Sequence, residues 1–381
     1  MYDAVAYGGM IADQGRFSAY GRAIDVRVAT GSVVLDLGAG PGIMALLACR
    51  AGAARVYAVE PDGIIQLGRQ AAVANDYADR VVFIQNLSTA IDLPEKVDGI
   101  VADLRGVLPL YGSCLASLID ARDRFLKPDG WLVAARDSLW AALVSSSSIH
   151  DGFVKGWTSG HSFDFSSALQ KSVNTWGRTT IGSDDVFGEP RCWATLDYKT
   201  IKSPNVAGEV SWTLDRSETA YGLAVWFETE TAPGITLSNS PFANERHVYR
   251  QAFFPWPKPT VLHAGDRVRV RFRANFVRGD YVWTWTTTIT DAGGGHPKAS
   301  YRQSNFFSAA VSREHLRKRA DTFVATPKLD ATIDRRILDL MGERLPLSRI
   351  AERILEEFPG SFADWDAALT RAGDLSERYS E

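Results

Sequence analysis

Along the first 135 residues, short apolar runs alternate with segments whose apolar residues recur every three or four positions. Such runs are typical of buried strands, and the longer spacing is typical of amphipathic helices. The pattern predicts strands at 33–37, 55–59, 81–85, 99–103 and 131–135, helices at 43–48, 66–77 and 115–125, and a turn at 127–130. Strands that alternate with helices favour a parallel sheet, which binds ligands at the carboxyl ends of its strands. We therefore expect an α/β domain over residues 1–135.

The pattern changes after residue 135. Short β-prone runs rich in Thr and aromatic residues lie between Gly and Pro turns, at 192–196, 210–214, 222–228, 268–272 and 281–290. They predict an antiparallel β-barrel-like domain over residues 136–320. Residues 150–186 are rich in Ser, Gly and aromatic residues and fit neither pattern.

The tail over residues 327–381 has helical periodicity and predicts a small helical C-terminal domain. Two apolar faces are expected, one formed by Ile333, Ile337, Leu338 and Met341 and the other by Leu347, Ile350, Ile354 and Phe358. Ser361–Phe362–Ala363–Asp364 resembles a capping box that would start a last helix carrying Trp365 and Leu369. Such a domain could recognise a partner or pack against the rest of the chain.

Composition limits the function classes. The chain has 381 residues, 45% of them hydrophobic, and a net charge of −3, so it carries no overall electrostatic signature of a nucleic-acid or membrane partner. Its three cysteines, Cys49, Cys114 and Cys192, lie far apart without metal-site spacing. Neither a signal peptide nor an apolar run of about 20 residues is visible. We expect a cytoplasmic protein with no metal, no nucleic-acid partner and no membrane partner.

A glycine-rich turn follows the first strand and carries the clearest chemical signal. Gly38, Gly40 and Gly42 are preceded by Asp36, and Glu60 ends the next strand about 20 residues later, where such folds place a carboxylate on ribose hydroxyls. This D-x-G-x-G-x-G form resembles motif I of class I S-adenosylmethionine (SAM) methyltransferases. The resemblance implies a Rossmann-like domain that binds SAM, with the turn residue Ala39 and Pro61 also at the cofactor.

The N-terminal stretch Met10–Ile11–Ala12–Asp13–Gln14–Gly15–Arg16 extends the resemblance to protein arginine methyltransferases, which covers most of residues 2–310. It implies that Arg16 binds the SAM carboxylate as a guanidinium fork and that Met10 packs over the cofactor. Ser88 and Thr89 would lie near the adenine, where relatives carry an acid. The insertion at 150–186 stands where relatives have a dimerisation arm, which implies a homodimer.

The catalytic signature departs from that family. Arginine methyltransferases clamp a guanidinium between two glutamates on one loop. Here Asp103 occupies the first of these positions and Gly112 the second, and Arg105 adds a cation between them. The position of the family's conserved loop histidine is occupied by Val248, next to His247. The loop therefore predicts a changed acceptor rather than a lost activity.

Candidates for accepting a proton from the acceptor are Asp103, Tyr249, His247 and Tyr111. Our first hypothesis is a SAM-dependent N-methyltransferase that acts on an amine of a peptide or protein. The tail weakly resembles winged-helix modules that bind leader peptides (PqqD-like modules), so the substrate could be the precursor of a ribosomal peptide natural product. The alternatives are an arginine or small-molecule methyltransferase with an altered acceptor loop, and a SAM-binding regulatory protein without turnover.

Overall fold

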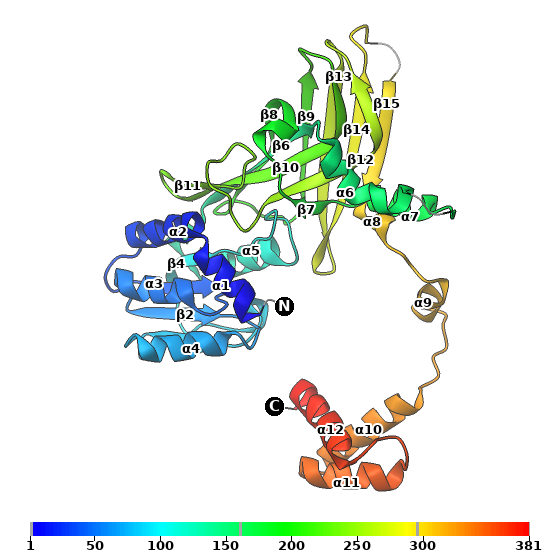
Figure 1. The fold of residues 1–381 in the computed structure, drawn as a ribbon. Coiled ribbons are helices and arrows are strands. Elements are labelled where there is room, and N and C mark those ends of the chain that lie inside the picture. Colours follow the sequence, from blue (N-terminus) through cyan, green and yellow to red (C-terminus); the bar gives the residue numbers. More distant parts are fainter. Residues whose placement is uncertain (1–2, 160–161, 295–296, 381) are drawn as a thin grey trace. The chain divides into compact units, whose positions relative to one another are not determined.

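The computed structural model describes residues 3–159, 162–294 and 297–380 (Figure 1). The chain divides into two compact units, of which the first ends at Ala309 and the second begins at Ala310. None of the described helices is both long and apolar enough to cross a membrane.

The first half of the larger unit is built on a parallel sheet in the order β3-β2-β1-β4-β5. Its strands are β1 (Val33–Leu37), β2 (Arg55–Val59), β3 (Val81–Ile84), β4 (Val97–Ala102) and β5 (Leu126–Val133). The predicted parallel α/β domain is confirmed. The predicted turn at 127–130 is instead a bulge within β5, because the pairing with β4 jumps from Leu126 to Trp131.

Helices flank this sheet and form one wall of the site. They are α1 (Ala4–Ala12), α2 (Gln14–Arg27), α3 (Ile43–Ala51), α4 (Ile65–Ala74), the one-turn η1 (Ser88–Ala90) and α5 (Cys114–Phe125). α2 contacts α3 and β5 on one side and the antiparallel strands β10 and β11 on the other. The N-terminal segment thus joins the two halves of this unit.

The second half consists of two antiparallel sheets, one in the order β7-β12-β10-β6-β8 with β11 paired to β10, and one in the order β15-β14-β13-β9. The strands are β6 (Arg136–Val144), β7 (Gly177–Thr179), β8 (Val186–Asp197), β9 (Val206–Thr213), β10 (Glu218–Ala232), β11 (Ile235–Ser238), β12 (Gln251–Leu262), β13 (Arg267–Val277), β14 (Asp280–Thr290) and β15 (Pro297–Ser304). The antiparallel β domain expected from the sequence is confirmed.

Aromatic side chains fill the space between these sheets. The ring of Phe254 on β12 lies 5.0 Å from that of Trp285 and 5.6 Å from that of Trp283, both on β14. It also stacks on Trp176 at 5.7 Å. Trp283 and Trp285 point inward because they occupy alternate positions of one strand.

The insertion at 150–186, whose pattern predicted no element, contains two helices, α6 (Ser147–Thr158) and α7 (Ser166–Val173), together with β7 and η2 (Ser183–Asp185). Few of its helical residues are buried: His150 and Val154 in α6, and Val173 in α7. α6 carries Ile149, Phe153 and Trp157 at helical spacing, but the Ser-, Gly- and aromatic-rich composition of the insertion obscured this signal. The unit ends with the short α8 (Asn305–Ser308).

The smaller unit has its own hydrophobic core among α10 (Leu329–Gly342), α11 (Leu347–Glu357) and α12 (Trp365–Tyr379), preceded by the short α9 (Arg313–Lys318). Two details of the prediction were wrong. Leu340 rather than Leu338 is buried in α10, and Asp364 rather than Ser361 is the N-cap of α12, where its side chain accepts a hydrogen bond from the Ala367 N–H at 2.8 Å. Among residues 310–380 no strand forms, so the β-wing of a winged helix is not part of this unit as described.

Candidate active site

The glycine-rich turn has the backbone geometry that the sequence implies. Gly38, Gly40 and Gly42 have φ values of +71°, +52° and +78°, a left-handed conformation that side chains with a Cβ rarely adopt. A Cβ on Gly40 would lie 2.7 Å from Cε1 of Tyr7 on α1, and one on Gly38 would overlap the side chain of Leu104. Glycine is thus required here both by φ and by space.

Two carboxylates lie beside the turn. Glu60 accepts hydrogen bonds from the N–H of Gly40 through Oε2 and from the N–H of Asp62 through Oε1, each at 3.0 Å. These bonds fix its orientation and leave each oxygen able to accept a second bond. Asp36 accepts from the Ala45 N–H at 2.9 Å, and complete burial raises the pKa of its carboxyl to about 7.

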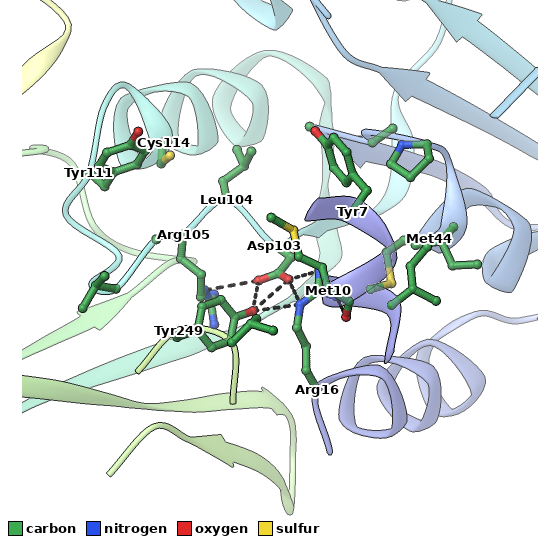
Figure 2. Close-up of a pocket in the computed structure, with 18 of the residues that line it drawn as sticks. Tyr7, Met10, Arg16, Met44, Asp103, Leu104, Arg105, Tyr111, Cys114 and Tyr249 are labelled. Atoms are coloured by element: carbon green, nitrogen blue, oxygen red, sulfur yellow. Dashed lines mark hydrogen bonds and ion pairs between the residues drawn. The ribbon is translucent and has the colours of Figure 1, made fainter. Parts of the chain in front are cut away.

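A cavity of about 490 Å³ extends from this turn to the antiparallel sheets (Figure 2). Its volume lies within the range of small-molecule sites. Its cofactor-side lining includes the predicted residues Met10, Arg16, Asp36, Gly38, Ala39 and Glu60, together with Tyr7, Ile11, Pro41, Ile43 and Met44. Its other end is lined by Asp103, Leu104, Arg105, Gly106, Val107, Tyr111, Cys114, Trp176, Arg178, Val248 and Tyr249.

Asp103, directly after β4, is the centre of a buried hydrogen-bond network. Its carboxylate accepts from Arg16 Nε at 2.5 Å, from the Tyr249 hydroxyl at 2.8 Å and from the Tyr20 hydroxyl at 3.0 Å. Burial alone would raise the pKa of Asp103, but the positive charges of Arg16 and Arg105 and the two hydroxyls hold it below its usual value. An acid with so low a pKa and so many donors is a weak proton acceptor.

Arg105 links this network to a second buried carboxylate. Its Nε lies 3.6 Å from Asp103 Oδ1, its Nη1 lies 3.4 Å from Oδ1 of Asp137 on β6, and Nη1 donates to the Thr229 hydroxyl at 2.6 Å. Tyr198 donates to the other oxygen of Asp137. The Arg105 side chain is only 3% exposed and that of Asp137 is fully buried. Together with Arg16, the cluster contains two cations and two carboxylates and is neutral.

Arg16 therefore does more than the resemblance implies. Besides its bonds to Asp103, it donates through Nη1 to the Met10 carbonyl at 3.0 Å and through Nε to the Tyr249 hydroxyl at 3.0 Å. A guanidinium has five N–H groups, so these bonds leave some for a ligand carboxylate on the cavity side. Arg16 connects the N-terminal helices, the loop after β4 and the antiparallel half.

His247 does not lie where a proton acceptor in the cavity would lie. Its Nδ1 is 2.8 Å from Oδ1 of Asp13, whose other oxygen accepts from the Val248 N–H at 2.9 Å. Asp13 is also the N-cap of α2 and accepts from the Arg16 N–H at 3.1 Å. His247 is absent from the cavity lining, whereas its neighbours Val248 and Tyr249 belong to it. Through Asp13, His247 therefore connects the loop over residues 244–249 to α2.

Of the other predicted residues, some line the cavity and others do not. Tyr111 lines the cavity and is 53% exposed, so the cavity reaches the surface there. Gly40, Gly42, Pro61, Ser88 and Thr89 do not line it, although Gly40 bonds to Glu60, which does. At Gly112 the chain has no side chain, and its N–H lies 3.3 Å from Oδ1 of Asp280. The second carboxylate of a guanidinium clamp is thus missing from the lining.

Several lining residues were not predicted as site residues. Tyr7 and Met44 lie next to the motifs and could have been inferred from helical position, since Tyr7 precedes Met10 by nearly one turn. Trp176 and Arg178 are in the insertion that showed no pattern. They face the cavity because β7 pairs with β12, where Arg178 is opposite Ala252. No local signal in the sequence announces that pairing.

The residues present fit SAM. The left-handed glycine turn lets a cofactor approach the backbone closely, and the oriented Glu60 carboxylate suits the ribose hydroxyls of SAM. The guanidinium of Arg16 has spare N–H groups for the cofactor's carboxylate, and the apolar Met10 and Met44 suit its aliphatic part. When bound, SAM supplies an electrophilic methyl group.

Family models match both halves of the larger unit. Residues 22–135 match a model described as ribosomal protein L11 methyltransferase (PrmA). Residues 135–288 match the arginine methyltransferase oligomerization subdomain. The boundary between the two matches coincides with the start of the antiparallel half at β6.

Each of two curated relatives covers more of the chain than either family model does alone. Protein arginine N-methyltransferase 6 of Xenopus tropicalis is 32% identical over 286 residues, which are 70% of this chain and 80% of the relative. Protein arginine N-methyltransferase 1 of Schizosaccharomyces pombe is 32% identical over 246 residues, which are 62% of this chain and 71% of the relative.

Solved structures have the same fold. The protein arginine methyltransferase 10 structure of Arabidopsis thaliana aligns with a TM-score of 0.68 at 23% identity, over 79% of this chain and 97% of that one. The Trypanosoma brucei PRMT1 enzyme-prozyme heterotetrameric complex with AdoHcy aligns with a TM-score of 0.71 at 22% identity, over 78% and 96%. With the sequence relatives, these matches settle the family. The chain belongs to the protein arginine N-methyltransferase family and is a SAM-dependent methyltransferase.

Proposed function

We propose that this enzyme methylates a nitrogen of a peptide or protein that is not the guanidinium of an arginine. The proposal rests on the hydrogen bonds and ion pairs that already occupy the carboxylate of Asp103. Of the described residues that line the acceptor end, Asp103 alone carries a carboxylate, which is already bonded to Arg16, Tyr20 and Tyr249 and lies 3.6 Å from Arg105. A substrate guanidinium would find no free carboxylate there.

Electrostatics supports this exclusion. A cation brought into a buried site costs several kcal/mol unless a carboxylate pairs with it. Here Arg105 is a resident cation whose charge is balanced by Asp137, and Arg178 adds another positive charge at the lining. A neutral acceptor needs no free carboxylate and avoids repulsion by Arg178, and the side chains of Val107, Cys114 and Trp176 suit an uncharged group.

The chain's residues can position such an acceptor without a strong base. An amine that binds in its neutral form presents its lone pair directly, and much of the rate enhancement then comes from orientation. The proton that the product must lose can pass to water where the cavity reaches the surface at Tyr111. Asp103 would act by holding Arg16 and Tyr249 in place, because its own pKa is too low for proton transfer from an amine.

Methylation of protein arginine is the second candidate, because the relatives are named for it. One contact shows where a second carboxylate for a substrate arginine could come from. Asp280 approaches the loop at Gly112, with its Oδ1 3.3 Å from the Gly112 N–H, although Asp280 does not line the cavity. A movement of this loop would be needed to bring that carboxylate to a guanidinium.

The partners belong to the same proposal. We propose a homodimer through the arm formed by α6 and α7, on which Trp157, Phe163 and Phe165 are 45%, 76% and 38% exposed. We also propose that the unit from residue 310 onward, which has a separate core, recognises part of a peptide substrate, such as the leader of a ribosomal peptide natural-product precursor. A cytoplasmic location is consistent with three unpaired cysteines.

The test is mass spectrometry of peptides incubated with enzyme and SAM. A pool containing arginine-rich, lysine-containing and free-amine peptides is analysed intact and then by fragmentation. Methyl groups on amines or amides support the proposal, and methyl groups confined to guanidinium nitrogens support the second candidate. As a control, Gly40→Arg should abolish transfer, because its side chain would collide with Tyr7 and block the glycine turn.

A further inference from the structure

The outer face of the four-stranded antiparallel sheet carries a row of arginines. In β13, Val268, Val270, Phe272 and Ala274 are buried, and the residues between them, Arg267, Arg269, Arg271 and Arg273, are exposed. Side chains alternate between the two faces of a strand, so these four arginines lie on one face. Arg302 on β15 joins them, because Thr286 pairs with Arg302 on one side and with Arg271 on the other. Figure 1 shows β13, β14 and β15 side by side.

We call the surface formed by Arg267, Arg269, Arg271, Arg273 and Arg302 the arginine face. Its positive charge is only partly balanced by carboxylates. Among the described residues, Glu209 on β9 is the acid that pairs with these arginines: it lies 3.5 Å from Arg269 Nε through Oε1 and bonds to Arg271 through Oε2. Arg267, Arg273 and Arg302 form no ion pair with any residue in the described part of the chain. In the described part of this face, five arginines face Glu209 and, at the start of β14, Asp280, whereas the whole protein has a net charge of −3.

Folding alone does not explain the row. The sheet needs apolar residues on its inner face, but any polar side chain would serve on the outer one, as the threonines of β14 at 284, 286, 288 and 290 show. Arginines at alternate positions of one strand are about 6.8 Å apart and repel one another. The arrangement is therefore better explained by a ligand that carries the opposite charge.

The spacing of the arginines and the inward position of the aromatic rings indicate the class of that ligand. A single-stranded nucleic acid would use exposed aromatic rings for stacking, but the large rings of this sheet, Phe272, Trp283 and Trp285, are turned into the core. An extended peptide repeats every second side chain at the same interval as the arginines. Carboxylates on such a peptide can pair with guanidinium groups, and the threonine hydroxyls beside them can form hydrogen bonds.

We propose that the arginine face, formed by Arg267, Arg269, Arg271, Arg273 and Arg302, binds an extended acidic segment of a polypeptide partner with Asp or Glu at alternate positions. The face is outside the cavity, since none of these residues lines it. Binding here adds a docking step to the enzyme and does not depend on which nitrogen is methylated.

Fluorescence anisotropy of the full-length protein tests the proposal, with a labelled decapeptide of alternating Glu and Thr as the probe. The variant R267Q/R273Q removes two arginines that have no ion pair. The matched control R22Q/R50Q removes two exposed arginines of α2 and α3 and changes the net charge equally. We expect R267Q/R273Q to weaken binding about five- to tenfold, and the control to weaken it less than twofold. Binding should also weaken as salt increases.

Two further probes make the test specific. A decapeptide with five Glu followed by five Thr has the same charge without the alternation, and a decamer of uridine is a single-stranded nucleic acid. Tighter binding of the alternating peptide than of either probe supports the proposal. Absence of binding, equal losses in the two variants, equal affinity for both peptides, or tighter binding of the uridine decamer would overturn it. Circular dichroism of both variants verifies that they are folded.

Discussion

At the scale of single residues, the acceptor site depends on the buried ion pair of Arg105 and Asp137, of which the sequence revealed only Arg105. Asp103 and Arg105 could be read from the loop after the fourth strand, because their distance from the glycine turn follows the family pattern. Asp137 could not, because it belongs to β6 in the other half of the unit and meets Arg105 only through tertiary packing. Sequence alone thus indicated an extra cation and gave no sign that its charge is balanced internally.

Breaking this pair should be costly. Arg105→Met would leave Asp137 buried with Tyr198 and Thr229 but without its cation, and the loss of one partner of a buried pair costs about 3–5 kcal/mol. The double variant Arg105→Met/Asp137→Asn removes both charges and keeps hydrogen bonding at position 137, so it should recover at least half of that loss. Urea unfolding monitored by circular dichroism measures both. A single variant within about 1 kcal/mol of wild type would contradict the buried ion pair.

Asp36 should make stability depend on pH. Its folded pKa of about 7 lies above the value of 3.8 for an exposed aspartate, so between these pH values the folded protein holds a proton that the unfolded chain has lost. Stability should therefore fall as pH rises from about 4 to 7 and stay level above 7. Asp36→Asn cannot titrate and should lack this component. Melting temperatures of both proteins between pH 5 and 8 test this, and parallel curves would refute the assignment.

At the scale of elements, the sequence predicted the helices and strands that local patterns encode. It failed for features that depend on contacts between side chains. The strands of the parallel sheet and the helices of the tail follow from apolar runs and helical spacing. The helices α6 and α7 were missed in a segment rich in Ser, Gly and aromatic residues, although Ile149, Phe153 and Trp157 of α6 have helical spacing. The start of α12 was misplaced because Ser361 and Asp364 both suit an N-cap, and only the structure shows which one accepts the Ala367 N–H.

The cap assignment can be tested directly. Asp364→Ala removes the side chain that accepts from the first turn of α12 and should lower the stability of the unit from residue 310 onward by about 0.5–2 kcal/mol. Ser361→Ala is the matched control and should change it by less than about 0.5 kcal/mol. Thermal unfolding monitored through Trp365, the tryptophan at the start of α12, measures both variants. A larger effect at Ser361 would restore the original capping-box interpretation.

At the scale of the whole molecule, the site joins parts that are far apart in the chain. Tyr7, Asp103, Trp176 and Tyr249 line one cavity, and none of the four belongs to the glycine turn or to the Met10–Arg16 stretch that indicate a methyltransferase. The cofactor end could be predicted because it is local to one βα turn. The acceptor end could be predicted only in part: Asp103, Tyr111 and Tyr249 were candidates, whereas Trp176 and Arg178 depend on how the antiparallel half meets the parallel sheet.

The proposed homodimer gives a prediction at this scale. Phe163→Asp places a charge among the exposed rings of the arm, where Phe163 lies 6.4 Å from Phe165. Burying that charge in an interface without a partner is unfavourable, so the variant should be monomeric. Val73→Asp on α4, at a residue 66% exposed, is the control and should leave the assembly unchanged. Light scattering coupled to size-exclusion chromatography gives the masses. A dimer that survives Phe163→Asp would place the interface elsewhere.

The division of the chain at residues 309 and 310 gives the last prediction. The core of the smaller unit contains Ile333, Ile337, Ile350, Ile354 and Leu375, and the cofactor end of the cavity is formed within the larger unit. A chain ending at Ala309 should therefore bind SAM within about twofold of the full-length affinity, as measured by calorimetry, because it keeps every residue of that site. If the smaller unit recognises the substrate, the same truncation should raise KM for a peptide substrate while kcat changes little, since recognition and chemistry are then separate. Loss of SAM binding would show that the two units do not fold independently. An unchanged KM would remove substrate recognition from the role of the smaller unit.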